Sequence, residues 1–200
     1  MKVKDIVKIA ILSVVGFVLS MLGALAAPLL GNYSFAGEVA FGAILSGTVF
    51  YILLQKVPKR GVAFLYYFIN ALAYVLTGFW PLSIVLLVAG LVAELCLIPV
   101  TSYKSPMRIT ISFILSTIVY GLHGVFFFGL IGTDRIAAAF PNMYTEDSIA
   151  TLSKYLLSPI AILILIIVLA FCAFIGSLIG QGIHTRFFSG KAQKQEGGLE

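Results

Sequence analysis

The sequence predicts an all-α integral membrane protein with six transmembrane helices, on two observations. Hydrophobic residues make up 60% of the chain and charged residues only 10%, with a mean hydropathy of +1.09, whereas about a quarter of the residues of a soluble domain are charged. In addition, six apolar runs are long enough to cross a bilayer, which takes about 20 helical residues. The runs are Ile6–Ala27, Ala36–Leu54, Gly61–Phe79, Pro81–Pro99, Ile109–Ile131 and Leu156–Ile183.

Residues that break or cap helices separate these runs in chain order. Proline lacks a backbone N–H and is tolerated in the first helical turn but not in a helix interior. The separating residues are Pro28 with Gly31 and Asn32, then Pro58, then Gly78 with Pro81, then Pro106 and finally Pro159. Each run therefore reads as one helix, and the chain as a single domain over residues 1–190. Residues 191–200 form a polar tail, whose last residues could derive from an expression vector.

The basic residues predict the orientation in the membrane, because cytoplasmic loops are enriched in Lys and Arg. Only Arg135 and Lys154 fall on the predicted outer side. The other eleven lie on one side, namely Lys2, Lys4, Lys8, Lys56, Lys59, Arg60, Lys104, Arg108, Arg186, Lys191 and Lys194. We therefore expect a multi-pass protein of the cell membrane with both termini in the cytoplasm. The net charge of +5 then needs no nucleic-acid partner, only the lipid bilayer.

One long connection, residues 132–156, lies on the outer side between the fifth and sixth helices. Thr145 followed by Glu146 and Asp147 is typical of a helix N-terminus. The stretch "SIATLSKYLL" then predicts a short amphipathic helix over the membrane face. Loops of this length are often binding loops or lids, and we interpret this one as a lid.

Two ionisable residues lie inside apolar runs, Glu38 and His123. Such residues cost free energy in a membrane helix and are by default functional candidates. Helix directions place both in the outer half, where an aromatic-walled cavity open to the outside could use them. The predicted substrate-binding residues are Glu38, His123, Asn70, Tyr74, Trp80, Asn32, Tyr33, Phe127 and Tyr144.

Each of these residues also has a structural interpretation. Glu38 and His123 could pair with each other as a clasp, and Asn70 could hydrogen-bond a neighbouring helix. Trp80 and Tyr33 lie where an interfacial aromatic belt would place them. Glu94, in the inner half of the fourth run, is interpreted as a structural or coupling residue and not as a ligand contact.

The absence of several sequence motifs limits the classes of function that the chain can have. It has no HExxH and no GxSxG sequence, and it has no Walker A sequence, so it is not expected to hydrolyse ATP. Cys96 and Cys172 both lie in apolar runs, which argues against a disulfide framework or a metal site. A binding subunit energised by other chains fits these absences, with an intramembrane enzyme or a membrane scaffold using Glu38 and His123 as the alternatives.

Five stretches resemble the Trep_Strep-type S components, the substrate-binding membrane subunits of energy-coupling factor (ECF) transporters. They are "VKDIVKIAILSVVGFV", "QKVPKRG", "LTGFWPL", "AGLVAELCL" and "FIGSLIGQGI", and the resemblance runs from about residue 3 to 190. It implies a six-helix bundle that captures a vitamin- or cofactor-like molecule outside the cell. It also implies two kinds of partner: a transmembrane coupling subunit (EcfT-like) and two cytoplasmic ATPase subunits. ATP-driven toppling of the S component would deliver the substrate to the cytoplasm.

The resemblance also implies docking on the coupling subunit through small residues of the first helix. The nearest matches here are Ala10, Ser13, Gly16 and Ser20. Most other small-residue pairs are interpreted as internal packing, although the end of the sixth helix could also dock a partner.

The ligand itself stays open at this point. A carboxylate and an imidazole in an aromatic pocket would suit a planar, partly cationic vitamin or cofactor. Haem or another tetrapyrrole is one version, with His123 as axial ligand; the other is that His123 only forms hydrogen bonds. No intrinsic cofactor is expected, and no metal unless the ligand is haem.

Overall fold

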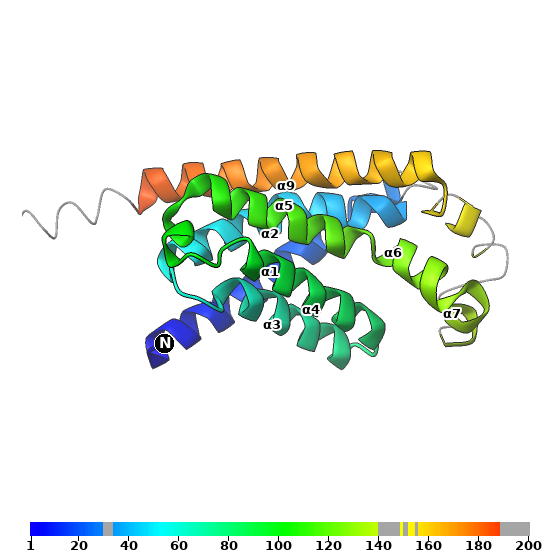
Figure 1. Ribbon diagram of the computed structural model, residues 1–200, viewed down its shortest axis with the longest axis horizontal. Coiled ribbons are helices and arrows are strands. Elements are labelled where there is room, and N and C mark those ends of the chain that lie inside the picture. Colours follow the sequence, from blue (N-terminus) through cyan, green and yellow to red (C-terminus); the bar gives the residue numbers. More distant parts are fainter. Residues whose placement is uncertain (30–33, 140–148, 150–151, 155, 189–200) are drawn as a thin grey trace, which may run out of the picture.

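A computed structural model describes residues 1–29, 34–139, 149, 152–154 and 156–188, and these are helical apart from their connections. Figure 1 shows the long helices running side by side in one elongated bundle. The elements, in chain order, are α1 (Val3–Ala24), α2 (Ser34–Lys56), α3 (Val62–Leu76), α4 (Trp80–Leu95), η2 (Val100–Lys104), α5 (Pro106–Gly121), α6 (His123–Phe126), η3 (Phe127–Ile131), α7 (Thr133–Ala139) and α9 (Pro159–Phe187).

Four apolar spans are long enough to cross a membrane, and all four coincide with predicted helices. They are Val3–Leu29, Gly37–Lys56, Pro106–Ile131 and Pro159–Phe187. The third and fourth predicted helices are shorter than expected, at 15 and 16 residues for α3 and α4. At 1.5 Å per residue each is about 22–24 Å long, less than the roughly 30 Å of hydrocarbon in a bilayer. The prediction of six full-length spans is therefore shown for four helices, with α3 and α4 as two shorter apolar helices.

The shortening of α3 and α4 has local causes. Gly61, just before α3, and Gly78, in the turn to α4, both have left-handed backbones with φ of 88° and 84°, a conformation that favours glycine. At the other end of α4, Pro99 disfavours helical backbone at the residue before it, and the chain turns into η2 (Figure 1). The apolar residues of these turns had made the runs look longer than the helices.

The fifth predicted helix is interrupted near its outer end. Leu122 has φ −81° and ψ 6°, and it separates α5 from the short α6. A π-helical turn follows in η3, closed by the Gly132 N–H donating to the Phe127 carbonyl at 3.1 Å. Such turns inside helices are frequent at functional sites. The sequence had given no clear sign of an interrupted helix.

Small residues bring the helices into close contact inside the bundle. A Cβ on Gly176 of α9 would overlap the Ala43 and Ile44 carbonyls of α2, and one on Gly23 of α1 would overlap the Phe41 carbonyl. Glycine is thus needed for α9 and α1 to approach the α2 backbone. This confirms that small-residue pairs pack helices within the chain, including the pair at the end of the sixth helix.

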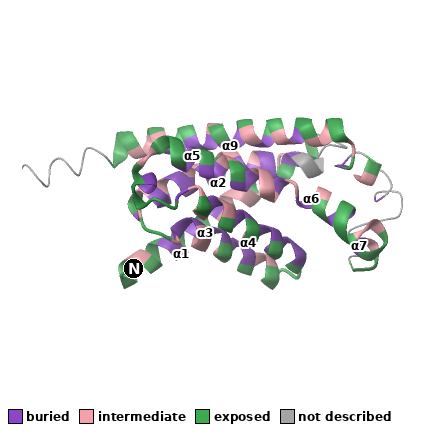
Figure 2. Cartoon of the chain, in the orientation of Figure 1, coloured by how far each residue is buried: buried purple, intermediate pink, exposed green. Residues whose placement is uncertain are grey.

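The predicted docking residues of α1 also face the bundle. Ser13 is fully buried, Gly16 lies against the Tyr66 hydroxyl, and Ser20 lies against Gly42. Ala10 is half-buried. The outward face of α1 carries instead large apolar side chains such as Ile11, Val14 and Val18. Figure 2 shows a comparable exposed face along α9. A coupling subunit that docked on the free face of α1 would therefore meet these side chains.

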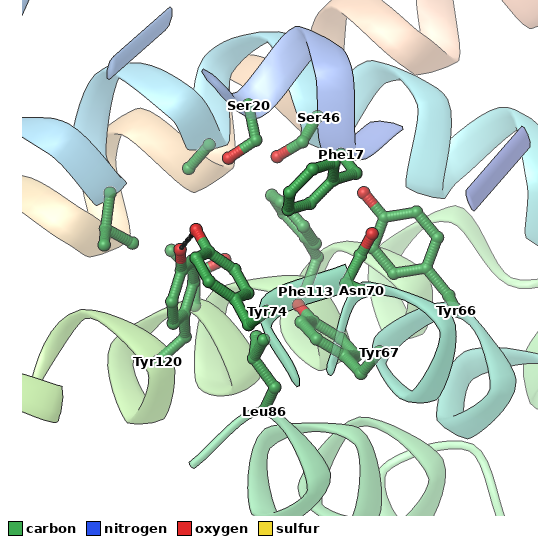
Figure 3. Close-up of a pocket in the computed structure, with 13 residues that line it drawn as sticks. Phe17, Ser20, Ser46, Tyr66, Tyr67, Asn70, Tyr74, Leu86, Phe113 and Tyr120 are labelled. Carbon is green, nitrogen blue, oxygen red and sulfur yellow. Dashed lines mark hydrogen bonds between the residues drawn. The ribbon is translucent and has the colours of Figure 1, made fainter. Parts of the chain in front are cut away.

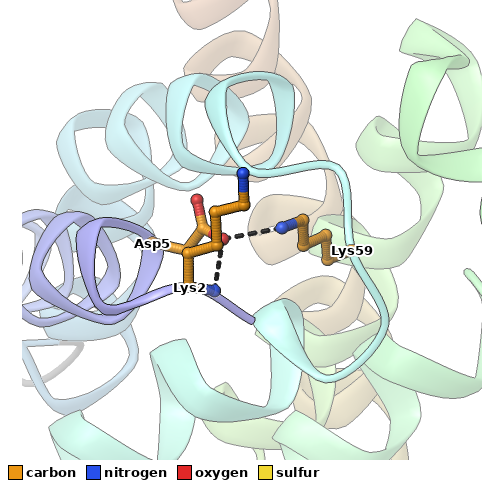
Figure 4. Close-up of polar contacts among 3 residues, drawn as sticks. All are labelled: Lys2, Asp5 and Lys59. Atoms are coloured by element: carbon orange, nitrogen blue, oxygen red, sulfur yellow. Dashed lines mark hydrogen bonds and ion pairs between the residues drawn. The ribbon is translucent and has the colours of Figure 1, made fainter.

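The N-terminus and the end of α9 lie at the same end of the bundle (Figure 1), as expected for an even number of crossings. We call this the inner end, following the predicted orientation. Here the Lys59 ammonium lies 2.6 Å from the Asp5 carboxylate, which also accepts the Lys2 backbone N–H at 2.9 Å (Figure 4). The pair joins the start of α1 to the connection between α2 and α3.

Glu94 of α4 ties three segments together at the inner end. Its carboxylate accepts the Gly61 N–H at 2.7 Å and the Phe64 N–H at 3.4 Å. Both groups lie at the start of α3, where backbone N–H groups have no acceptor within the helix. The Tyr103 hydroxyl of η2 donates to the same carboxylate. Burial and this hydrogen bond raise the pKa of Tyr103 above its usual value, so the hydroxyl keeps its proton. The contacts agree with the structural interpretation of Glu94.

The connection between α7 and α9 is described only in part. α7 packs against η3 and buries Ile136. Within the predicted amphipathic helix, residues 149, 152–154 and 156 are helical, and Ile149 and Leu156 are buried. The predicted N-cap at Thr145 lies outside the described residues, and the role of this connection as a lid stays a prediction.

Candidate functional site

A cavity lies between α1 and α2 on one side and α3, α4 and α5 on the other (Figure 3). Its volume is about 30 Å³, room for about two water molecules. It is lined by Phe17, Ser20, Val39, Ala43, Ser46, Tyr66, Tyr67, Asn70, Tyr74, Leu86, Phe113, Thr117 and Tyr120. It extends from the middle of the bundle toward the predicted outer end, as the sequence-based hypothesis required of a binding site.

Two tyrosine hydroxyls close the outer part of the cavity. The Tyr74 and Tyr120 oxygens are 2.9 Å apart and join α3 to α5, and the dashed line in Figure 3 marks this bond. The Phe17 ring packs edge-on against Tyr74, with ring centroids 5.4 Å apart. Both tyrosines are half-buried, so they form a rim and not a sealed wall.

Asn70 lies deeper in the cavity with an unmet hydrogen-bonding need. Its side chain is 7% exposed and lines the cavity, and the amide interacts with the Tyr66 hydroxyl one turn earlier on α3. Its Oδ1 atom is buried with no hydrogen-bond partner in the described part of the chain. A buried polar atom of this kind costs about 1–3 kcal/mol relative to a paired one. The alternative that Asn70 hydrogen-bonds a neighbouring helix through this oxygen is not what the structure shows. The atom is instead available to a molecule in the cavity.

Glu38 lies at the rim and not in the cavity. Its side chain is exposed, while the next residue, Val39, is buried and lines the cavity. Because Glu38 and Val39 are neighbours on α2, the Glu38 carboxyl group lies beside the cavity. The expectation that Glu38 lines the cavity is therefore not met in this conformation, and contact with a ligand stays a prediction.

His123 lies behind Tyr120, outside the lining. It is 4% exposed, its Nδ1 atom is 2.9 Å from the Tyr120 carbonyl, and its ring stacks on the Tyr120 ring at a centroid distance of 5.8 Å. Phe127 packs edge-on against the other part of the ring at 5.5 Å. This packing lets His123 position Tyr120. Axial ligation of haem iron by His123 stays a prediction.

No ion pair joins Glu38 to His123 among the residues that the structure describes. The clasp interpretation stays a prediction.

The remaining predicted residues lie away from the cavity or outside the described chain. Trp80 is 59% exposed at the start of α4, as expected of an interfacial aromatic residue. Phe127 is buried against His123 and Phe79. Asn32, Tyr33 and Tyr144 lie outside the described residues. Of the nine predicted ligand contacts, the structure thus brings Asn70 and Tyr74 into the cavity.

Sequence reasoning missed several lining residues. Tyr66, Tyr67 and Tyr120 supply hydroxyls to the cavity, together with Ser46 and Thr117. Ser20, predicted as a docking residue, also lines it. One available signal was the spacing of Tyr66, Asn70 and Tyr74 at i, i+4 and i+8, which puts three polar groups on one face of a helix.

The described residues contain no group of three or more His, Cys, Asp or Glu side chains that could hold a metal ion. Cys96 and Cys172 are both free thiols.

Comparison with known proteins gives one match. The family described as "Hypothetical bacterial integral membrane protein (Trep_Strep)" matches residues 3–189. Comparisons with curated proteins and with solved structures find no significant match. Because the family matches nearly the whole described chain, the protein belongs to the Trep_Strep family.

Proposed function

We propose, from the premise that the chain is a Trep_Strep integral membrane protein, that it is the substrate-binding subunit of an ATP-driven importer of the ECF type. It would capture a vitamin- or cofactor-like small molecule from the outer side. A transmembrane coupling subunit and two cytoplasmic ATPase subunits would supply the energy and carry the bound molecule inward. The chain itself would catalyse no reaction.

The observation that carries this proposal is the unpaired Oδ1 atom of Asn70 in a cavity of the membrane-embedded bundle. A protein gains nothing in stability from such an atom, because the unmade hydrogen bond is a net cost. Binding sites routinely retain polar groups of this kind to fix the orientation of a ligand. A pure membrane scaffold would not need one.

The cavity must enlarge before it holds a whole ligand. Sites for small molecules usually measure about 300–1,000 Å³, against about 30 Å³ here. The described conformation is therefore interpreted as a closed one. The Tyr74–Tyr120 bond spans the outer part of the cavity, and its breakage would widen the space between α3 and α5.

The experiment that tests the function is uptake by a reconstituted complex. The chain is combined with a coupling subunit and two ATPases from the same organism in liposomes, and any small molecule that co-purifies is identified by mass spectrometry and absorbance. We expect ATP-dependent uptake of that molecule, lost in Asn70→Leu and retained in Gln55→Leu, a matched change of a half-buried amide at the inner end.

Three outcomes would count against the proposal. The first is the absence of any complex with a coupling subunit, and the second is uptake that does not depend on Asn70. The third is turnover of a lipid or peptide by the chain alone, which would favour the enzyme alternative. An absorbance band typical of haem that is lost in His123→Ala would keep the transport function and assign a tetrapyrrole as the substrate.

A further inference from the structure

The described residues that line the cavity carry no carboxylate, amine, guanidinium or imidazole group. Six are aromatic, and the polar ones contribute only hydroxyls and one amide. The sequence-based expectation of a partly cationic ligand rested on Glu38 and His123, and neither belongs to the lining. The charge preference of the cavity therefore has to be worked out from the lining residues themselves.

The Tyr67 hydroxyl donates its proton to the Ser116 Oγ atom and cannot donate it to a ligand. The Ser116 Oγ atom lies 2.8 Å from the Ser112 carbonyl and 3.0 Å from the Phe113 carbonyl, so its single proton points to these acceptors. Ser116 can then only accept from Tyr67, whose hydroxyl lies 2.6 Å away. Because that proton is used, Tyr67 cannot donate to an anion in the cavity.

The Asn70 Oδ1 atom is an acceptor only. An amide oxygen has two lone pairs and no proton, and this one has no partner among the described residues. Its need is for an N–H or O–H donor. A carboxylate or phosphate oxygen placed against it would leave both groups unpaired and add repulsion.

The aromatic rings favour the same charge. Ring faces carry negative electrostatic potential and attract ammonium groups. The six rings are Phe17, Tyr66, Tyr67, Tyr74, Phe113 and Tyr120. Glu38, the residue before the lining residue Val39 on α2, is an exposed acid beside the cavity.

We infer that the part of the ligand that enters this cavity is a positively charged nitrogen bearing at least one N–H, as in a protonated amine or amidine, and not a carboxylate or phosphate. The N–H donates to Asn70 Oδ1, and the rings surround the charge. The inference deepens the proposed binding function and rests on it.

Three probes of similar size and shape test the charge preference. They are benzylamine, which is protonated at neutral pH, benzyl alcohol, which is neutral, and benzoate, which is an anion. All three need the same enlargement of the cavity, so differences in their affinity report charge and hydrogen bonding. Binding to the purified chain in detergent is measured by equilibrium dialysis. We expect benzylamine to bind about tenfold or more tightly than benzoate, the factor that one charge-assisted hydrogen bond supplies.

Variants locate the preference in the cavity. Asn70→Leu should abolish most of the preference for benzylamine, and Gln55→Leu should retain it. Glu38→Gln should reduce it more weakly, because that carboxylate is exposed at the rim, while Asp134→Asn, an exposed acid on α7, should have no effect.

Equal or tighter binding of benzyl alcohol or benzoate overturns the inference, as does the absence of measurable benzylamine binding at millimolar concentration. A preference that survives Asn70→Leu overturns it too, because the site would lie elsewhere. None of these results decides the transport function, which is judged by ATP-dependent uptake of the co-purified molecule.

Discussion

The Tyr74 hydroxyl lies 2.9 Å from the Tyr120 hydroxyl and joins α3 to α5 across the outer part of the cavity. If this bond holds the two helices together, Tyr74→Phe and Tyr120→Phe should each cost about 1 kcal/mol of stability. The double variant should cost no more than either single one, because each change removes the same bond. Thermal unfolding of the purified protein in detergent measures the cycle.

A distant tyrosine provides the control for this cycle. Tyr51 lies on α2 near the inner end, beside Gln55. Combined with Tyr74→Phe, the change Tyr51→Phe should be additive. Additivity between Tyr74→Phe and Tyr120→Phe as well would show that the bond contributes nothing to stability.

Replacement of Asn70 should reveal a conflict between stability and function. In Asn70→Leu an apolar side chain of similar size replaces a buried amide whose oxygen has no hydrogen-bond partner, so the midpoint of thermal unfolding should stay unchanged or rise. Binding of the co-purified molecule should be lost. A strong loss of stability would instead mean that the Asn70 oxygen makes a structural hydrogen bond and is not available to a ligand.

Glu94 should prove important for stability and not for ligand affinity. Glu94→Ala removes the acceptor for two N–H groups of α3 and for the buried Tyr103 hydroxyl. We expect a loss of about 2–4 kcal/mol, and a smaller loss in Tyr103→Phe, where the carboxylate keeps its other donors. Unfolding of the two variants in detergent checks this. Weaker ligand binding with unchanged stability would contradict the structural interpretation and point to a ligand contact.

The close packing of α9 on α2 gives a matched pair of glycine variants on one helix. A Cβ on Gly176 would overlap the Ala43 and Ile44 carbonyls, whereas none of the surrounding atoms lies within 4 Å of a Cβ on Gly182. Gly176→Ala should therefore destabilise the protein by about 1–3 kcal/mol. Gly182→Ala should be neutral or slightly stabilising. If Gly176→Ala kept full stability but lost the complex with the coupling subunit, this face would be a docking surface after all.

The orientation in the membrane can be tested by cysteine labelling in intact cells. With Cys96 and Cys172 replaced, Thr77→Cys places a thiol in the turn between α3 and α4, and Lys104→Cys places one at the inner end. The distribution of Lys and Arg predicts that a membrane-impermeant maleimide labels Thr77→Cys only. Labelling of Lys104→Cys alone would invert the topology and put the cavity on the cytoplasmic side.

The order and approximate position of the helices could be predicted from the sequence, because hydropathy reports which segments leave water. The ends of α3 and α4 could not, because apolar residues such as Leu97 and Ile98 occur both in membrane helices and in the turns that pack against them. No proline in the sequence marks the interruption at Leu122. Hydropathy does not encode such an interruption, because the apolar run continues through it.

The site was predicted in location more than in composition. Ionisable residues attracted attention because of their cost in a membrane, yet His123 is enclosed beside Tyr120 and Glu38 is exposed. Tyr66 and Tyr67 line the cavity but look like ordinary apolar helix residues in the sequence. Helices that are apolar on all sides give no periodic signal of the face that turns inward, so packing alone decides which tyrosines meet.

Because Gly176 and Gly180 press α9 directly onto the α2 main chain, no deformable layer of side chains separates these helices. α2 and α9 would therefore move together as one rigid unit, and α1 would move with them because Gly23 contacts the Phe41 backbone. The cavity would then enlarge for a ligand only by movement of α3 away from this rigid unit. Ligand binding should therefore displace α3 and α4, which the turn at Gly78 joins, and leave α2 and α9 in place.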